Sequence, residues 1–148
     1  MNWESRPLLV AEDNDDDYFL LQRAIKKANL HNPVRRAKNG QEAVDYLAGT
    51  GMYEDRIEYP FPQLLLLDLK MPLMHGFDVL SWIRKQKELR SLPVVIFSSS
   101  PHTEDIRKGY EWGANGYLTK STSVAALVEV VSAIQAYWLR FNCAPDGR

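Results

Sequence analysis

The chain has 148 residues, of which 45% are hydrophobic and 25% are charged, and its formal net charge is −1. This length suits one domain with its own core, and the composition is that of an ordinary globular protein. A near-neutral balance with no dominant concentration of Lys and Arg argues against a nucleic-acid-binding surface. The single cysteine, Cys143, excludes an internal disulfide and suits a reducing compartment.

Nothing in the sequence indicates a membrane protein. The strongly apolar stretches are far shorter than the roughly 20 residues that cross a bilayer. The N-terminal segment MNWESRP lacks the charged-then-apolar order of a signal peptide. We therefore expect a cytoplasmic protein.

Short apolar runs alternate with segments of helical periodicity. The pattern predicts five strands, at 8–11, 34–38, 63–68, 92–98 and 116–119. It predicts helices between and after them, around 21–28, at 41–47, around 77–84, at 103–112 with Thr103 as its N-cap, and a long final one at 124–141. A long loop at 49–62 precedes the third strand. Apolar runs without alternation are typical of parallel strands buried on both faces and covered by crossover helices. The predicted fold class is α/β, with one open five-stranded parallel sheet and helices on both faces.

Polar side chains follow four of these strands at the point where each strand ends. Glu12 and Asp13 follow the first strand and Asp68 closes the third. Ser98 closes the fourth strand and Lys120 follows the fifth. Because ligands of open α/β sheets bind outside the carboxyl ends of the strands, we expect these side chains to form one site.

The chemistry of this site points to phosphoryl transfer. Neighbouring carboxylates repel one another, and a hard divalent cation such as Mg²⁺ relieves the repulsion while leaving room for phosphate oxygens. A carboxylate can also act as a nucleophile toward a phosphoryl group, whose transfer depends on positioning and charge neutralisation. Asp68 is the candidate phosphoacceptor, Lys120 supplies a positive charge and Ser98 supplies a hydroxyl donor.

At this point the sequence resembles the receiver domain of two-component response regulators, from Leu8 to about Phe141. The motifs that carry the resemblance are Glu12-Asp13, LLLLDLKMPLMHG around Asp68 with its glycine Gly76, PVVIFSSS and GYLTK. The resemblance implies a flavodoxin-like sheet with strand order 2-1-3-4-5. It also implies a single receiver domain over residues 1–148, with a core at about 6–141 and a C-terminal tail at 142–148.

The resemblance assigns a role to each acidic residue. Asp13 binds Mg²⁺ directly and Glu12 binds it through water. Asp68 accepts the phosphoryl group from a histidine kinase and also binds the metal, with the backbone carbonyl of Lys70 completing the protein ligands.

Further roles carry over to the residues around Asp68. Lys120 contacts the phosphoryl oxygens, Ser98 moves toward the phosphate, and Tyr117 swings inward with it as the second switch residue. Lys70 and Ser100 occupy positions that tune the rate at which the phosphate is lost.

One position departs from the family pattern. Ser121 stands where the family usually has a proline after the lysine, often in a cis peptide bond. A cis bond without proline costs about 3–4 kcal/mol. Either Ser121 accepts that cost, or the loop takes a different path.

A finer resemblance concerns partners. The long loop at 49–62, the Lys120-Ser121 pair and the extended final helix resemble the small regulators that partner phytochrome-type kinases. A stand-alone regulator of this kind signals through protein contacts, including those with a downstream phosphotransfer or effector protein.

The final helix is apolar over much of its circumference, which favours a homodimer through it and the fourth helix, or a docked partner. Its main stripe consists of Leu127, Val130, Val131, Ile134, Trp138 and Phe141.

Other residues have simpler interpretations. Asp15, Asp16 and Asp17 suit a helix cap and a solvated face. The three histidines lack metal-ligand spacing and are expected at the surface. For the aromatic residues of the 53–61 segment, a recognition surface and an inward-packed loop are both open.

Two rival functions differ in class. Phosphatases that form an aspartyl-phosphate intermediate resemble one another in a second Asp two residues after the nucleophile. This chain has Lys70 at that position and also lacks a cap domain to enclose a substrate. We therefore expect no enzyme, only self-catalysed phosphoryl acceptance and autodephosphorylation. The other rival, a phosphate-independent receiver-like interaction module, stays open because only an assay separates it.

Overall fold

The computed structural model describes residues 6–145, which form one parallel sheet with the order β2-β1-β3-β4-β5. This confirms the predicted fold class and strand order. The beginning of the MNWESRP segment and the end of the predicted tail lie outside the described residues. The strands are β1 (Leu8–Ala11), β2 (Val34–Ala37), β3 (Leu64–Leu67), β4 (Val94–Ser98) and β5 (Gly116–Thr119).

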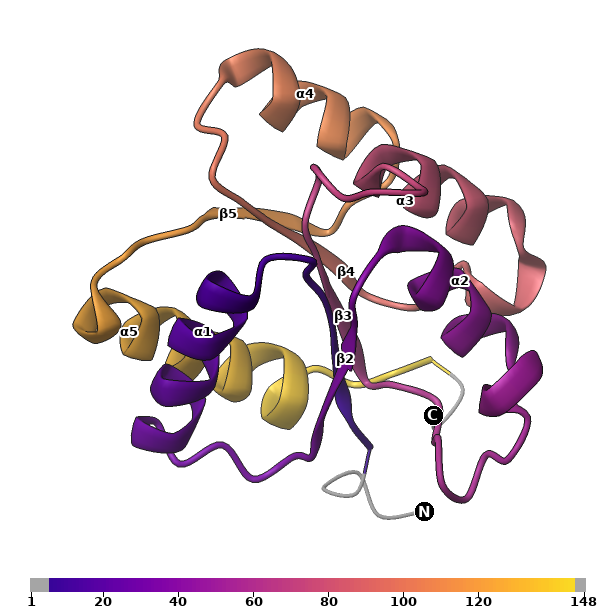
Figure 1. Ribbon diagram of the computed structural model, residues 1–148, viewed down its shortest axis with the longest axis horizontal. Helices are drawn as coiled ribbons and strands as arrows, with labels where there is room; N and C mark the ends of the chain where they lie inside the picture. The colour runs from indigo at the N-terminus through magenta and orange to yellow at the C-terminus, as the bar shows by residue number, and fades with distance from the viewer. Residues whose placement is uncertain (1–5, 146–148) are drawn as a thin grey trace.

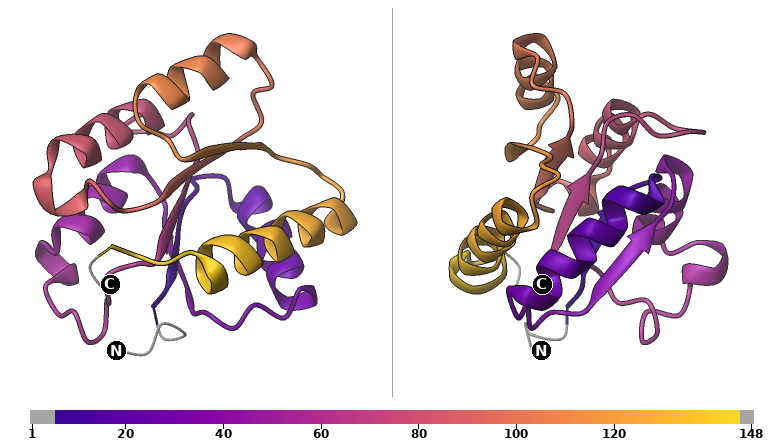
Figure 2. Two further views of the ribbon diagram at one scale, coloured as in Figure 1. Left: turned by 180° about the vertical axis from the view of Figure 1, so that it is seen from behind. Right: turned by 60° about the vertical axis from the view of Figure 1, so that its left-hand side comes forward.

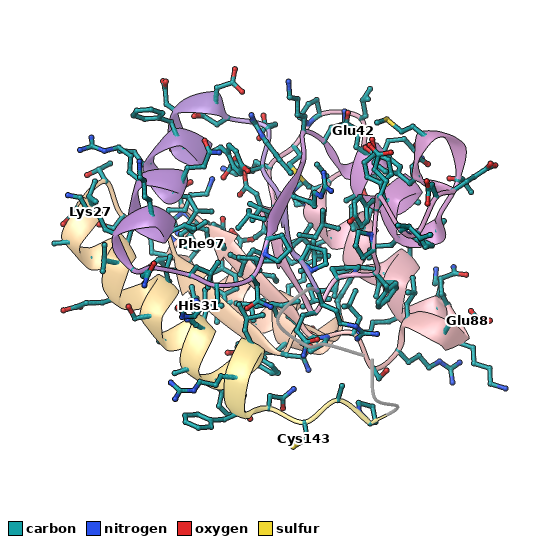
Figure 3. The ribbon with its side chains drawn as sticks, turned by 90° about the horizontal axis from the view of Figure 1, so that it is seen from below. Lys27, His31, Glu42, Glu88, Phe97 and Cys143 are labelled. Atoms are coloured by element: carbon teal, nitrogen blue, oxygen red, sulfur yellow. The ribbon has the colours of Figure 1, made fainter. Side chains whose placement is uncertain are left out.

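Helices cover both faces of the sheet (Figure 1). Helices α1 and α5 lie side by side on one face, and α2 and α3 lie together on the other (Figure 2). From below, the sheet separates these two layers (Figure 3). The helices are α1 (Asp15–Lys27), α2 (Gly40–Ala48), α3 (Gly76–Lys85), α4 (Thr103–Glu111) and α5 (Val124–Ile134).

Strand β3 shows why the central strands are uniformly apolar. Its four leucines alternate between two cores, because successive side chains of a strand point to opposite faces. Leu65 and Leu67 pack in the core under α2 and α3, while Leu64 and Leu66 pack in the core under α1 and α5. Each leucine is at most 1% exposed. The run therefore has no solvent-facing side, as the sequence predicted.

Two predictions about helix ends and histidines were wrong. Thr103 is the first residue of α4 rather than its N-cap, and His102 holds the cap position without a side-chain hydrogen bond. His75 is half-buried rather than a surface residue. Its Nδ1 accepts a hydrogen bond from the Phe77 N–H at 3.1 Å, so it caps α3. His31 and His102 are exposed, as expected.

The aromatic residues of the 53–61 segment, in the loop after α2, pack inward. Of the two alternatives, an inward-packed loop and a recognition surface, the structure therefore has the first. The Tyr53 ring lies 5.0 Å from that of Tyr46 and 5.1 Å from that of Tyr59, between centroids. Arg56 donates hydrogen bonds to the carbonyl oxygens of Tyr46 and Leu47 at 2.7 and 2.9 Å. These carbonyls belong to the last turn of α2, so the loop closes that helix and covers the core.

The final helix spans the predicted range, 124–141, but it is a longer apolar stretch than the sequence analysis allowed when it excluded a membrane span. Helix α5 continues as a π-helical segment, Gln135–Phe141. Val124–Phe141 has a mean hydropathy of 1.4 over 18 residues, enough by length and composition alone to cross a membrane. However, α5 packs against α1, and Leu127, Val131 and Ile134 belong to the core beneath them. Core helices of globular proteins can be as long and as apolar as this one, so its length and composition are weak evidence for a membrane span. Only 22% of the 18 residues are buried, which leaves apolar surface uncovered.

Gly76 lets α3 approach the end of β3 closely. Its N–H donates a hydrogen bond to the Leu69 carbonyl at 2.7 Å. A Cβ atom at this position would overlap the carbonyl oxygen of Asp68 and would lie 2.7 Å from the Leu69 Cα. Both are backbone atoms, so a side chain here displaces the segment that carries Asp68.

We predict that Gly76→Ala lowers the free energy of unfolding by about 2–3 kcal/mol, because the added methyl group forces backbone atoms apart. Urea denaturation followed by circular dichroism measures the change. The matched control is Gly116→Ala, since the nearest atom to an added Cβ there lies 3.5 Å away, at ordinary van der Waals contact. Equal stability of the two variants would contradict the close packing of α3 on Asp68.

Candidate functional site

The sheet register brings the predicted site residues to one edge. Parallel pairing aligns the carboxyl ends of β1 with β3 and of β4 with β5. The residues that close or follow these strands therefore gather where the strands end, above α1 and beside α3 (Figure 1). They are Glu12, Asp13, Asp68, Ser98 and Lys120.

Three carboxylates form a candidate cation site. Oxygen atoms of Glu12, Asp13 and Asp68 lie within 4.8 Å of one another. Glu12 is 3% exposed and Asp68 is 7% exposed, whereas Asp13 is more open. Opposite oxygen ligands of Mg²⁺ lie about 4.2 Å apart, because each Mg–O bond is about 2.1 Å. The spacing thus fits a divalent cation after slight contraction, or with one carboxylate bound through water.

Lys120 is the positive charge of this cluster. Its Nζ lies 2.5 Å from Glu12 Oε1, 2.9 Å from Asp17 Oδ2 and 3.2 Å from Asp68 Oδ2. The other oxygen of Asp68, Oδ1, accepts a hydrogen bond from the Leu69 N–H at 2.8 Å. One ammonium group thus faces carboxylates from β1, α1 and β3.

Burial and charge act in opposite directions on these groups. Burial, together with the charge of Asp68, raises the pKa of Glu12 to about 7 against the opposing hydrogen bond from Lys120. Burial lowers the pKa of Lys120, but its hydrogen bonds to Glu12 and Asp17 and the charge of Asp68 outweigh burial and raise that pKa. A single lysine therefore leaves the carboxylates short of positive charge, which a divalent cation would supply.

The peptide bond after Lys120 is trans, since no cis peptide bond occurs within residues 6–145. Of the two alternatives at Ser121, the loop takes the different path. The Lys120 N–H donates a hydrogen bond to the Ser98 carbonyl at 2.8 Å, which ties the end of β5 to the end of β4.

A chain of hydrogen bonds links Ser98 to Tyr117. Ser98 Oγ accepts a hydrogen bond from the Ser100 N–H at 3.1 Å. The Ser100 carbonyl accepts one from the Tyr117 hydroxyl at 2.8 Å, and Ser100 Oγ donates to Asp105 Oδ2 at 2.5 Å. The two predicted switch residues are therefore connected through the loop between β4 and α4.

Asp17 was missed by the sequence analysis. The cap of α1 is Asn14, whose Oδ1 accepts a hydrogen bond from the Asp17 N–H at 2.9 Å. Asp15 lies on the exposed side and pairs with Arg36 at 2.9 Å, whereas Asp17 reaches Lys120. No local pattern signals this contact, because its partner lies near the other end of the chain. Lys70 is exposed in the loop after Asp68.

Comparison with known proteins agrees with this geometry. The response regulator receiver domain matches residues 8–132. The chain belongs to this family. Response regulator Rcp1 of Synechocystis sp. is 34% identical over 148 residues, which cover 98% of this chain and 99% of Rcp1.

Solved structures narrow the type of receiver. RPA3017, a response regulator in red light signaling of R. palustris, has a TM-score of 0.89 at 31% identity, covering 95% of this chain and 98% of that one. The phosphorylated cyanobacterial phytochrome response regulator RcpA has a TM-score of 0.86 at 32% identity, covering 96% and 99%. The Mn²⁺-bound form of Rcp1 has a TM-score of 0.82 at 32% identity, covering 95% and 99%. The chain is therefore a two-component signalling protein of the Rcp1 and RcpA type, and the Mn²⁺ in Rcp1 points to a divalent-metal site.

We predict that the protein binds one Mn²⁺ ion and that Asp13→Asn weakens binding at least tenfold, because the variant removes a charged oxygen ligand. Electron paramagnetic resonance measures free Mn²⁺ in the titration. The matched control is Asp16→Asn, which removes the same charge from an exposed neighbour. Equal affinities of the two variants would place the ion elsewhere.

Proposed function

We propose that this protein is a stand-alone response regulator that accepts a phosphoryl group on Asp68 from a histidine kinase in the presence of Mg²⁺. The observation that carries the proposal is the contact of Lys120 with both Glu12 and Asp68 inside a cluster of carboxylates. A nucleophile, a fixed positive charge and a candidate cation site are the parts that phosphoryl transfer needs.

In the proposed reaction, an Asp68 carboxylate oxygen attacks the phosphorus of phosphohistidine. The new O–P bond forms as the P–N bond breaks, and the electron pair of that bond stays on the histidine nitrogen. Asp13, Asp68 and the Lys70 carbonyl, with Glu12 through water, would hold Mg²⁺, which would supply neutralising charge to the phosphoryl oxygens.

The remaining residues respond to the new charge. Lys120 turns one N–H from Asp68 toward a phosphoryl oxygen. Ser98 gives up its bond with the Ser100 N–H to donate its hydroxyl, and the Ser100 carbonyl carries the change to Tyr117. Lys70 and the Ser100 side chain line the approach of the hydrolytic water, which sets how long the phosphate lasts.

The proposed upstream partner is a phytochrome-type kinase. Support comes from RcpA, a phytochrome response regulator, and from RPA3017, which acts in red light signaling. Residues 1–148 would form one cytoplasmic receiver domain, with a core at 6–141 and a tail at 142–148, that signals to a phosphotransfer or effector protein through its surface.

We also propose that the protein forms a homodimer through α5 and α4. A groove of about 400 Å³ lies between β5 and α5 and is almost entirely apolar. Its lining includes Leu118, Val130, Ala133, Tyr137 and Trp138. Of these residues Tyr137 is 57% exposed, and Tyr110 on α4 is 52% exposed. A second copy of the chain would cover this surface, and closed two-fold pairing is the commonest arrangement among soluble oligomers.

We expect acetyl phosphate with Mg²⁺ to add one phosphoryl group to the wild type and none to Asp68→Asn, because the amide is not a nucleophile. Intact mass spectrometry detects the addition, which EDTA should abolish. No addition to a folded, metal-binding wild type would favour the phosphate-independent module.

Transfer from a purified phytochrome kinase, compared with an unrelated histidine kinase, tests the upstream partner.

For the dimer, we predict that Ala133→Glu weakens self-association at least tenfold, because the carboxylate would be buried in an apolar contact. Analytical ultracentrifugation with and without beryllofluoride measures the association. Ser132→Glu is the matched control, since it adds the same charge at an exposed position of α5. A wild type that stays monomeric in both conditions would exclude the dimer.

A further inference from the structure

Asp17 is held in a fixed position at the start of α1. Its N–H donates a hydrogen bond to the Asn14 side chain, which fixes the first turn of the helix. Its carboxylate leaves the helix surface and reaches the Nζ atom of Lys120 at 2.9 Å. The Lys120 side chain is 12% exposed and that of Asp17 is 41% exposed, so the contact lies at the rim of the buried cluster.

The ammonium group of Lys120 has three hydrogens, and three carboxylates lie around it. Glu12 and Asp68 belong to the site already described. Asp17 is the third, and it approaches from a helix rather than from the end of a strand. Because a lysine side chain has four flexible carbons, the direction of its Nζ atom depends on such contacts.

We propose that Asp17 is a positioning residue that acts through Lys120 and speeds the uptake of the phosphoryl group by Asp68. This inference rests on the proposed function. When one N–H of Lys120 turns from Asp68 to a phosphoryl oxygen, Glu12 and Asp17 keep the ammonium group at the site. Without Asp17, Lys120 retains one side-chain anchor, and its approach to the phosphoryl oxygen is less well ordered before the reaction.

The chain contains a matched control in the same turn of the helix. Asp16 is exposed, and replacing it removes the same charge next to the site. Long-range effects of charge on the phosphate donor and on the metal therefore appear in both Asp16→Asn and Asp17→Asn. Asp15 is a poorer control because it pairs with Arg36.

The experiment measures the rate of phosphorylation by acetyl phosphate at saturating Mg²⁺ in the full chain. We expect Asp17→Asn to lower the rate about three- to tenfold relative to Asp16→Asn, as the loss of one charge-assisted contact implies. Asp17→Glu, which keeps a carboxylate, should recover part of the rate. Equal rates in Asp17→Asn and Asp16→Asn, or a faster reaction in Asp17→Asn, would overturn the proposal.

A double-mutant cycle tests whether Asp17 acts through Lys120. In a Lys120→Ala background, Asp17→Asn should change the rate less than twofold, since the group that Asp17 positions is absent. The same loss in both backgrounds would mean that Asp17 acts by another route, and the proposal would fail.

A spectroscopic measurement separates this proposal from the proposed function. The ¹⁵Nζ signal of Lys120 in the NMR spectrum reports its ordering without any phosphorylation. We expect it to shift and broaden in Asp17→Asn but not in Asp16→Asn. If the wild type takes up no phosphoryl group, the proposed function fails, while an Asp17-dependent Lys120 signal still supports positioning. An unchanged signal in Asp17→Asn overturns positioning whatever the phosphorylation result.

Discussion

A carboxylate buried at the end of an apolar strand is the constraint on which the rest of the site depends. Asp68 follows four leucines and is 7% exposed, and a carboxylate buried in this way costs free energy unless a positive charge lies beside it. Lys120 supplies that charge from β5, although β4 separates β5 from β3 in the sheet. Two strand spacings are about 9–10 Å, so only a long side chain can cross the end of β4. The crossing starts beside the end of β4, where the Lys120 N–H bonds to the Ser98 carbonyl.

The same crossing explains why so many elements meet at one ammonium group. The contacts of Lys120 join β5 to β1 through Glu12, to β3 through Asp68 and to α1 through Asp17. Its backbone N–H adds a link to β4 at the Ser98 carbonyl. A change of charge at Asp68 therefore alters the contacts of several elements together. Burial raises the pKa of Glu12, whereas a bound cation would favour its charged form. These contacts therefore also depend on whether a cation is present.

Features that repeat locally were predictable, and contacts between distant residues were not. The apolar run of β3 and the acidic pair Glu12-Asp13 predicted the sheet and the edge where the carboxylates gather. The approach of Asp17 to Lys120 has no sequence signal, because it depends on how α1 leaves β1. The inward packing of the aromatic loop depends in the same way on Arg56, which reaches carbonyls at the end of α2. The prediction of Thr103 as the N-cap of α4 was wrong because Thr suits either the cap or the first turn, and propensity alone does not separate adjacent positions.

Tyr117 connects the charged edge of the sheet with α4. Its hydroxyl group bonds to the Ser100 carbonyl, two residues beyond Ser98, while its ring lies beside Gly109 of α4 and packs against the core under α2 and α3. Gly109 of α4 allows this arrangement, because a Cβ atom there would lie 3.4 Å from the Tyr117 ring and 2.7 Å from Ile96. A rotation of Tyr117 would thus break the hydrogen bond to Ser100 and remove the packing of the ring beside α4. The side chain therefore joins the loop that follows Ser98 to the packing of α4, without any movement of the strands between them.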